Sequence, residues 1–556
     1  MIRVFLLGAA SGKRIINRLV SAASRQAGAG LLFRRCSMKS FFSLLAMMTL
    51  MLTGLSASTL AAASDETVKI GVVGFCDSLE PTEQYFSWVV TRYAVGETLV
   101  RFDEQMNIQP WLAESWTLAD DKLTWTFKIR AGVKFSNGNP MTAEAVKNSL
   151  ERTFAMSKRA SANFFEYDFI RAEGNSLIIK SKKPAPMLAG CLADPLFLIV
   201  DTGVDTTKFA TEGPICTGPY AVESFSRGLT VVRKNEHYWD GEVPYQEVTI
   251  QTIDDTNTRT MALQGGEIAF AVNIAASDVA LFRDQPDFTV DEIASLRSVL
   301  SFMNQHGPLK DLKLRQAVIR ALNREAYAKY LLHDTFAPGK APVPPSLDYG
   351  FDDLIDPNAY DVASAKKLLA EAGYEDVDGD GFVEGPDGQK LTLRHIIYNS
   401  RAELPILAEA SQADLKKIGL NTKVESYDYT SLLDMQESGD YDLLIWNVIT
   451  VNTGDPEHYL RELWKSHTEV NKNNNTADYS NPKVDELLDR LAVEFDLAER
   501  RQIIIDVQQL IINDAASIFF AYPETNIIYN NKMVRGVKMV PSDYYWLTKN
   551  IRPATK

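Results

Sequence analysis

Apolar residues recur along the chain with two periodicities, one typical of β-strands and one typical of α-helices. Every second residue is apolar in one predicted strand, at Leu123, Trp125, Phe127 and Ile129. Helices are predicted from about Thr142 and behind Asp311 and Asp361, which precede apolar positions spaced about 3.6 residues apart. Because strands and helices alternate through most of the chain, the sequence predicts α/β lobes in which helices cover the sheets.

The second half of the chain is richer in predicted helices. Gly373 ends one of them, and another ends at Ile418-Gly419. A further helix has its apolar face at Ile504, Val507, Leu510 and Ile511. The run Leu443–Trp446 predicts a buried strand, and the polar stretch after it is expected to hold no helix as far as about Tyr479.

A chain of 556 residues is too long for a single ordinary core, so two or more lobes are expected. With 46% hydrophobic residues it contains enough apolar material to pack them. It shows no internal repeat and no low-complexity linker. The lobes are therefore predicted to be joined by short crossings of the chain.

The first 63 residues differ from the rest, since they contain eight Lys and Arg residues and no Asp or Glu. Lys39 is followed by an apolar run from Phe41 to Leu52 and by the small residues Ala61 to Ala63. This is the pattern of a cleaved export signal, with Met38 as the expected start and residues 1–63 removed. The alternative is a membrane anchor, but the run is too short to span a bilayer of about 30 Å as a helix. No Cys follows the run, so a periplasmic protein without a lipid anchor is predicted.

The charge balance excludes two classes of partner. Without its eight N-terminal basic residues the chain has 50 basic and 72 acidic residues, a net charge of −22 instead of −14. Such an acidic protein repels nucleic acid and anionic lipid. No later stretch reaches 18 consecutive apolar residues, as a membrane-spanning helix would.

The sequence carries no recognisable catalytic pattern. It has no G-x-S-x-G and no H-E-x-x-H, and its six His residues are scattered without metal-ligand spacing. The protein is therefore not expected to be an enzyme. Of its four Cys residues, Cys36 would leave with the signal, and Cys191 and Cys216 could form a disulfide. Three separate buried thiols, with Cys76 as the third, remain the alternative.

Several short motifs occur in a definite order. They are the segments 97–100, 110–116, 125–135, 217–220, 235–239, 315–324, 368–374 and 414–419. In order and spacing they resemble the extracellular solute-binding proteins of peptide and nickel ABC importers (solute-binding family 5). The resemblance covers roughly residues 67–550, and the nickel- and metallophore-binding members resemble the chain most.

This resemblance implies a fold and a way of working. The fold is a two-lobe periplasmic-binding-protein type II fold, in its large (cluster C) form with an extra subdomain in the first lobe. Residues 64–304 and 526–556 would form lobe I and residues 305–525 lobe II. A monomer would close on a small ligand, a metal chelate or a short peptide, and deliver it to the importer's permease in the inner membrane.

The resemblance also implies ligand-binding residues in the second lobe. Trp446 and the run Asn452-Thr453-Gly454-Asp455 match a cleft motif of the family. Peptide-binding relatives carry Asp where this chain has Asn452, and a neutral amide loses the charge-assisted hydrogen bond to a peptide's amino group. A nickel chelate or metallophore complex is therefore favoured over a di- or oligopeptide.

His467 stands where nickel-binding members place a His on a loop, and imidazole suits nickel. The alternative is an exposed loop His without a role. His458 is less favoured as a ligand. A chelator would complete the coordination and bring carboxylates, which call for an Arg. The Arg of the nickel relative near Asp194 has no counterpart, and Arg159 is the predicted substitute. Aromatic side chains expected to wall the pocket, or else to pack in the core, are Tyr85, Trp88 and Phe164.

One further motif lies outside the cleft. Asp376 to Gly381 has the D-x-D-x-D-G pattern of a calcium loop, with Asp387 at position twelve instead of the usual Glu. In the family this segment forms a hairpin turn, which is the favoured interpretation. Any calcium bound there would be structural.

Overall fold

A computed structural model of the protein describes residues 66–555, except for residues 75, 399–400, 452 and 469–473. The predicted export signal and Cys36 lie outside these residues. Within the described part of the chain, no helix has both the length and the apolar composition needed to cross a membrane.

The central feature of the described residues is one mixed sheet of 12 strands. Its main path runs β16-β15-β17-β13-β18-β11-β1-β10-β9-β8, and β12 and β14 also pair with β18. The strands are β1 (Thr67–Val72), β8 (Tyr220–Ser226), β9 (Leu229–Lys234), β10 (Glu247–Thr252), β11 (Phe270–Val272), β12 (Phe288–Ala294), β13 (Arg297–Met303), β14 (Phe336–Pro338), β15 (Thr392–Tyr398), β16 (Asn421–Tyr427), β17 (Leu443–Ile449) and β18 (Ser517–Asn530).

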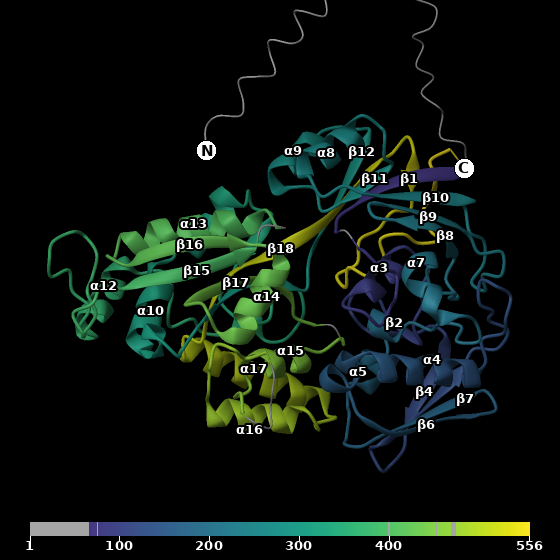
Figure 1. The fold of residues 1–556 in the computed structure, drawn as a ribbon, viewed down its shortest axis with the longest axis horizontal. Helices are drawn as coiled ribbons and strands as arrows, with labels where there is room; N and C mark the ends of the chain where they lie inside the picture. Colours follow the sequence, from purple (N-terminus) through teal and green to yellow (C-terminus); the bar gives the residue numbers. More distant parts are fainter. Residues whose placement is uncertain (1–65, 75, 399–400, 452, 469–473, 556) are drawn as a thin grey trace, which may run out of the picture. The chain divides into compact units, whose positions relative to one another are not determined.

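The long strand β18 belongs to both lobes (Figure 1). Its first residues, Ser517 to Ala521, pair with β13, whereas Glu524 to Asn530 pair with β12. The chain also passes from β12 to β13 through Ser295 and Leu296. It therefore crosses between the two sets of strands twice, and the crossings are short, as the absence of a linker predicted. We call the strands before Ser295 and their helices the first lobe, and those from β13 to Tyr522 the second lobe.

The two crossings are hydrogen-bonded to each other. The Ser295 hydroxyl donates to the Pro523 carbonyl at 2.7 Å, and its backbone N–H reaches the same oxygen at 3.2 Å. Ser346 in turn donates to the Ser295 carbonyl at 2.8 Å. The lobe boundaries predicted at 304/305 and 525/526 lie a few residues further along the chain and stay a prediction.

In the second lobe, the helices pack around the β15–β16–β17 end of the sheet and enclose a large apolar core. Asp311 and Asp361 cap α10 and α12 with their side chains, as predicted. The helices are α10 (Leu312–Ala321), α11 (Arg324–Ala326), α12 (Val362–Glu371), α13 (Glu403–Lys416), α14 (Tyr429–Ser438), α15 (Glu457–Trp464), α16 (Pro482–Leu491) and α17 (Leu497–Asn513). Two short 3-10 helices, η3 (Pro308–Lys310) and η5 (Phe351–Asp353), and a π-helical segment, η4 (Tyr327–Leu331), complete the lobe.

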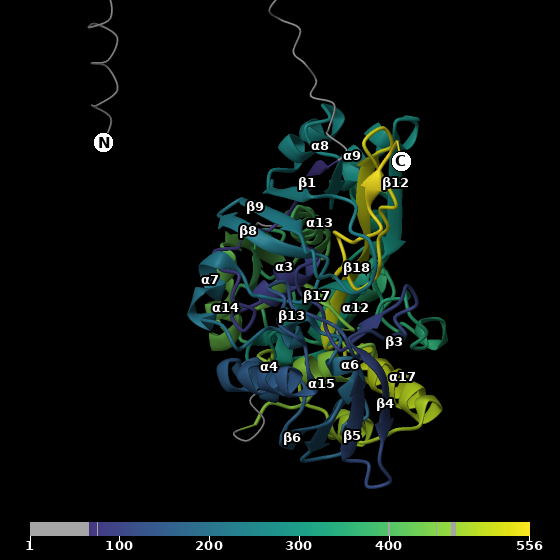
Figure 2. The same cartoon turned by 90° about the vertical axis from the view of Figure 1, so that its right-hand side faces the viewer.

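The first lobe carries an additional sheet of order β4-β5-β7-β6, and α4 packs against β6 and β7 (Figure 1 and Figure 2). Trp125, Phe127 and Ile129 of β5 point into its core, which confirms the predicted alternation. The strands of the additional sheet are β4 (Ala113–Leu118), β5 (Thr124–Ile129), β6 (Tyr167–Glu173) and β7 (Ser176–Ser181). Two separate pairs are formed by β2 (Val100–Phe102) with β3 (Ile108–Pro110), and by β19 (Val534–Arg535) with β20 (Arg552–Pro553) near the C-terminus. The helices are α3 (Phe86–Arg92), α4 (Ala143–Met156), α5 (Lys158–Asn163), α6 (Leu188–Cys191), α7 (Phe209–Glu212), α8 (Thr256–Gln264) and α9 (Ala276–Arg283), with the short turns η1 (Pro195–Phe197) and η2 (Thr206–Lys208).

One stretch of the second lobe contains a helix that the sequence did not predict. The stretch before Tyr479 was predicted to be free of helix, but α15 lies within it and buries Tyr459, Leu460 and Leu463. The helical spacing of these residues is short and begins directly after a Gly-Asp-Pro turn, which masks it in the sequence.

Cys191 and Cys216 form no disulfide, and Cys76 is likewise free; all three thiols are buried.

Candidate functional site

Charged residues from distant parts of the chain meet where the lobes join. Arg92 at the end of α3 reaches Asp543 with two groups, Nη2 to the carboxylate at 2.6 Å and Nε to the backbone carbonyl at 2.9 Å. Arg297, the first residue of β13, lies 3.9 Å from the same carboxylate. Arg401, between β15 and α13, interacts electrostatically with Asp543, Arg297 and Glu403. We call these five residues the arginine cluster.

The arginine cluster holds more positive than negative charge, with three guanidinium groups facing two carboxylates. Burial, together with repulsion from Arg401 and Arg92, lowers the pKa of Arg297 to about 10, and Asp543 offsets only part of this effect. Buried like charges are unfavourable unless a counter-charge is near. The cluster is therefore suited to an anionic group, above all a carboxylate, which Arg binds with two hydrogen bonds.

Aromatic rings surround this charge. The Arg92 guanidinium lies 4.1 Å from the centre of the Trp546 ring and 5.5 Å from that of Trp88. Trp88 contacts Tyr85 at 5.5 Å and Tyr544 at 5.3 Å between ring centres. A cavity of about 210 Å³ lies here, lined among others by Tyr85, Trp88, Arg92 and Trp546. The structure thus brings the predicted Tyr85 and Trp88 beside the arginine cluster.

Trp446 contributes from the second lobe. It lies on β17 and contacts the ring of Tyr398 at 6.0 Å. The next residue, Asn447, connects two members of the cluster, since its side chain donates to Glu403 at 2.7 Å and accepts from Arg297 at 3.3 Å. Because successive side chains of a strand point to opposite faces, Trp446 is related to the cluster through Tyr398, which interacts with Arg297 and Arg401.

Arg159 and Phe164 lie at the two ends of α5 in the first lobe. Arg159 donates to the carbonyl of Gln84 at 2.7 Å, and its guanidinium lies 4.3 Å from the centre of the Tyr85 ring. The positive charge of Arg159 also counteracts the effect of burial, which raises the pKa of Asp194. Arg159 therefore belongs to the wall formed by Tyr85.

His458, the second residue of α15, meets this wall from the second lobe. Its ring stacks on Phe164 at 5.8 Å with an interplanar angle of 22°. Burial lowers the pKa of His458 to about 4, helped by the positive charges of Arg159 and Arg461. The imidazole is thus neutral near pH 7, which is the form that binds metals.

His467 is in a different position. It is exposed and follows the C-terminal end of α15, whereas His458 is at the N-terminal end of the helix. The role of His467 as a metal ligand therefore stays a prediction. Asn452 lies outside the described residues.

The segment after β17 docks onto the first lobe. Val451 is buried in the core of the additional sheet. The carbonyl of Thr453 lies so close to α6 that a Cβ added to Gly190 would be 2.0 Å from its oxygen. Gly454, with φ of +80°, similarly approaches Phe102 of β2. The predicted Thr453 thus lies directly against α6 of the first lobe.

Asp455 supports this segment from within the second lobe. Its carboxylate and Arg500 of α17 form a buried ion pair, with Arg500 Nε 3.0 Å and Nη2 2.9 Å from the two oxygens. One oxygen also accepts the Glu457 backbone N–H at 2.8 Å, at the start of α15. Breaking a buried pair of this kind costs about 3–5 kcal/mol. In this conformation Asp455 directs its oxygens to the protein itself.

The chain matches known proteins in both sequence and structure. Residues 107–471 match the family model described as bacterial extracellular solute-binding proteins, family 5 middle. This match covers more than half of the chain. The protein belongs to this family.

Two curated relatives match by sequence. The nickel-binding protein NikA of Staphylococcus aureus is 25% identical over 462 residues, 83% of this chain and 89% of that relative. The glutathione-binding protein GsiB of Pectobacterium atrosepticum is 27% identical over 503 residues, 88% and 94% of the two chains.

Among solved structures, that of Staphylococcus aureus NikA in complex with Ni(L-His)2 has a TM-score of 0.75 at 23% identity and covers 88% of this chain and 100% of the other. The predicted two-lobe α/β fold of the family is thereby confirmed. As a family-5 solute-binding protein, the chain is a binding protein and not an enzyme.

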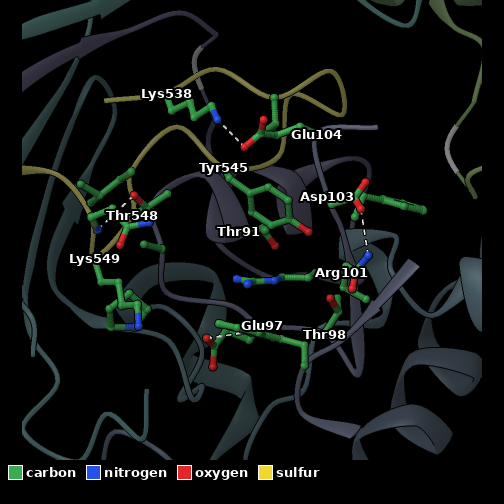
Figure 3. Close-up of a pocket in the computed structure, with 18 of the residues that line it drawn as sticks. Thr91, Glu97, Thr98, Arg101, Asp103, Glu104, Lys538, Tyr545, Thr548 and Lys549 are labelled. Carbon is green, nitrogen blue, oxygen red and sulfur yellow. Dashed lines mark hydrogen bonds and ion pairs between the residues drawn. The ribbon is translucent and has the colours of Figure 1, made fainter. Parts of the chain in front are cut away.

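This family-5 solute-binding protein also has a larger cavity, of about 420 Å³, lined among others by Arg101 and Tyr545 (Figure 3). It is lined by the first lobe and the C-terminal segment, and none of the predicted site residues lines it. Lys538 pairs with Glu104 at one end, and Lys549 with Asp240 near the other. Both lysines of this cavity are therefore paired within the protein, while the Arg101 guanidinium lies over the Trp111 ring, 3.5 Å from its centre.

Glu97 lies at the base of this larger cavity. Its carboxylate accepts four hydrogen bonds, from Thr217 at 2.7 Å, Trp111 at 3.0 Å, Trp239 at 3.1 Å and Tyr238 at 3.3 Å. Burial nevertheless outweighs these bonds and raises the pKa of Glu97 to about 7. The carboxylate joins four segments of the first lobe.

This arrangement predicts a pH-dependent stability. Because the folded protein holds the Glu97 proton more tightly than the unfolded chain, the contribution of Glu97 is greatest below pH 4.5 and falls as the pH rises to about 7. The loss should be roughly 3 kcal/mol. Urea unfolding of the wild type and Glu97→Gln, at intervals across this range, should show a difference in unfolding free energy that changes with pH. Glu104→Gln, at the exposed rim, is the control. A difference independent of pH would contradict the assignment.

Proposed function

We propose that this protein captures a carboxylate-bearing nickel chelate, such as nickel bound by free histidine, and delivers it to the permease of an ABC importer from the periplasm. The observation that carries the proposal is the arginine cluster, in which three guanidinium groups from both lobes face only two carboxylates. A chelate's carboxylates would supply the missing negative charge, and flat rings such as Trp88 suit a planar chelate.

Two features support a ligand that contains nickel. NikA of Staphylococcus aureus is named for nickel and was solved with Ni(L-His)2. In this chain, the neutral imidazole of His458 lies at the junction of the lobes beside Arg159. Imidazole is a preferred ligand of nickel. We therefore propose His458 as the protein's metal ligand, with His467, the residue indicated by the sequence, as the alternative.

The second candidate ligand is a short peptide such as glutathione. GsiB, 27% identical, is named for glutathione binding. A peptide also carries carboxylates that the arginine cluster could bind. Asn452 argues against a peptide ligand, because an uncharged residue forms a weaker hydrogen bond to a peptide's amino group than Asp does.

Calorimetric titration of the ligand-stripped protein separates these ligands. Nickel with histidine should bind tightly, nickel alone weakly, and glutathione and a panel of di- and tripeptides weakly, because only the chelate offers both metal and carboxylates. His458→Ala should weaken binding of the chelate by about tenfold or more, and His467→Ala should not. Tight peptide binding without metal would refute the proposal, and the reverse order of the two variants would move the metal ligand to His467.

The arginine cluster has its own test. Arg297→Gln should weaken chelate binding by roughly 10- to 150-fold, the loss of a charged hydrogen bond worth about 1.5–3 kcal/mol. Arg552→Gln, exposed on β20, is the matched control and should leave the affinity unchanged. If Arg297 were only structural, the variant would lower the unfolding temperature and bind the chelate as before.

Closure is tested at Gly190. A methyl group there would meet the Thr453 carbonyl, so Gly190→Ala should weaken chelate binding by about 1–3 kcal/mol, roughly 5- to 150-fold. The thermal unfolding of the ligand-free protein should not fall, because Ala favours the helix in which Gly190 lies. Gly307→Ala, where the nearest atom is 3.9 Å away, is the control. Equal affinities for the two variants would show that binding does not require this contact.

A further inference from the structure

The loop between α12 and β15 brings acidic side chains together on the second lobe. Glu375 pairs with Glu384 in antiparallel fashion, which closes residues 376–383 into a hairpin turn, as predicted. Gly379 and Gly381 adopt φ values of +78° and +92°, which only glycine accommodates easily. Both oxygens of Asp376 accept backbone N–H groups of these glycines, at 2.8 and 3.0 Å. The backbone thus wraps around the Asp376 carboxylate.

Three carboxylates converge inside this turn. One oxygen each of Asp376, Asp378 and Glu384 lies within 4.8 Å of the other two. Counted from Asp376, these are loop positions 1, 3 and 9. The sequence suggested Asp387, at position 12, as the closing ligand, but Asp387 accepts the backbone N–H of Gln389 at 3.0 Å and is not part of the group. Glu384 takes the place that the sequence assigned to Asp387.

A buried carboxylate oxygen of Glu384 is a second, independent observation that points to a bound cation. Its side chain is only 6% exposed, although the other two carboxylates are exposed. Oε2 accepts the Val377 backbone N–H at 2.8 Å, while Oε1 is buried and has no hydrogen-bond partner among the described residues. A buried carboxylate oxygen without a partner is costly. A bound cation would remove this cost.

We propose that this loop binds a calcium ion through Asp376, Asp378 and Glu384. Calcium prefers oxygen ligands, tolerates irregular geometry and takes carboxylates readily. Nickel and zinc favour imidazole or thiolate, and no His or Cys occurs between residues 376 and 390. Magnesium demands a smaller, nearly octahedral site. The ion would hold together the connection between α12 and β15, independently of the ligand bound at the arginine cluster.

Lys390 competes with such an ion. Its ammonium group contacts the carboxylates of Asp378, at 2.8 Å, and Asp380. Both neighbours raise the pKa of Lys390, so it stays charged. Calcium must therefore displace this ammonium from Asp378. Removing the Lys390 charge should strengthen calcium binding, whereas removing the Glu384 charge should weaken it, and no structural role of the loop predicts these opposite signs.

The test is a calorimetric titration of the metal-stripped, full-length mature protein with calcium chloride, and in parallel with magnesium chloride. The wild type should bind one calcium more tightly than magnesium, with an affinity between micromolar and millimolar. Glu384→Gln should weaken calcium binding by about tenfold or more, and Lys390→Gln should strengthen it severalfold. Asp387→Asn is the matched control within the loop and should change it little.

Thermal unfolding gives a second readout. Calcium should raise the unfolding temperature of the wild type, and a chelating agent should reverse the shift. No saturable calcium heat up to about 10 mM would overturn the proposal. So would an unchanged affinity in Glu384→Gln, or equal effects of Glu384→Gln and Asp387→Asn. Nickel-chelate binding should be the same with and without calcium, so a failure here leaves the function proposed above untouched.

Discussion

The structure depends most on the surplus of positive charge buried where the two lobes meet. Arg92, Arg297 and Arg401 share Asp543 and Glu403, and burial with mutual repulsion already lowers the pKa of Arg297. Partly buried like charges are unfavourable unless counter-charges are near. The proposed carboxylate-bearing ligand would add such counter-charges at the place where both lobes contribute arginines.

The fold presents these charges beside the two crossings of the chain. Arg297 begins β13 directly after the first crossing, and Asp543 follows the second crossing on the C-terminal segment. The crossings are tied to each other by the bond from Ser295 to Pro523. Asp543 itself has φ of +58°, in the left-handed region that Asp adopts more readily than most residues, and it accepts two hydrogen bonds from Arg92. Away from the crossings, the Thr453 carbonyl of the second lobe lies against Gly190 of α6 in the first lobe.

Periodicity and motif order were enough to predict the α/β lobes, the strand β5 and the caps Asp311 and Asp361, because each depends on a few neighbouring residues. The helix α15 was missed because its apolar spacing spans only two turns after a Gly-Asp-Pro sequence. The arginine cluster could not be found from local pattern at all. Its arginines are separated by one to two hundred residues and are brought together only by the crossings of the chain.

The predicted site residues show the same limit of local sequence pattern, which does not tell which distant residues meet. The sequence placed Tyr85, Trp88, Arg159, Phe164 and Trp446 in one region, and the structure brings them around the junction of the lobes. It could not tell that Asp455 pairs with Arg500, since that partner lies on a different helix. Nor could it choose between His458 and His467, which sit at opposite ends of α15.

Small-angle X-ray scattering of the ligand-stripped protein tests the central claim, that a carboxylate-bearing ligand draws the two lobes together. Addition of nickel with histidine should reduce the radius of gyration, and nickel alone should leave it unchanged. A radius that stays the same although calorimetry shows the chelate bound would contradict closure around the arginine cluster.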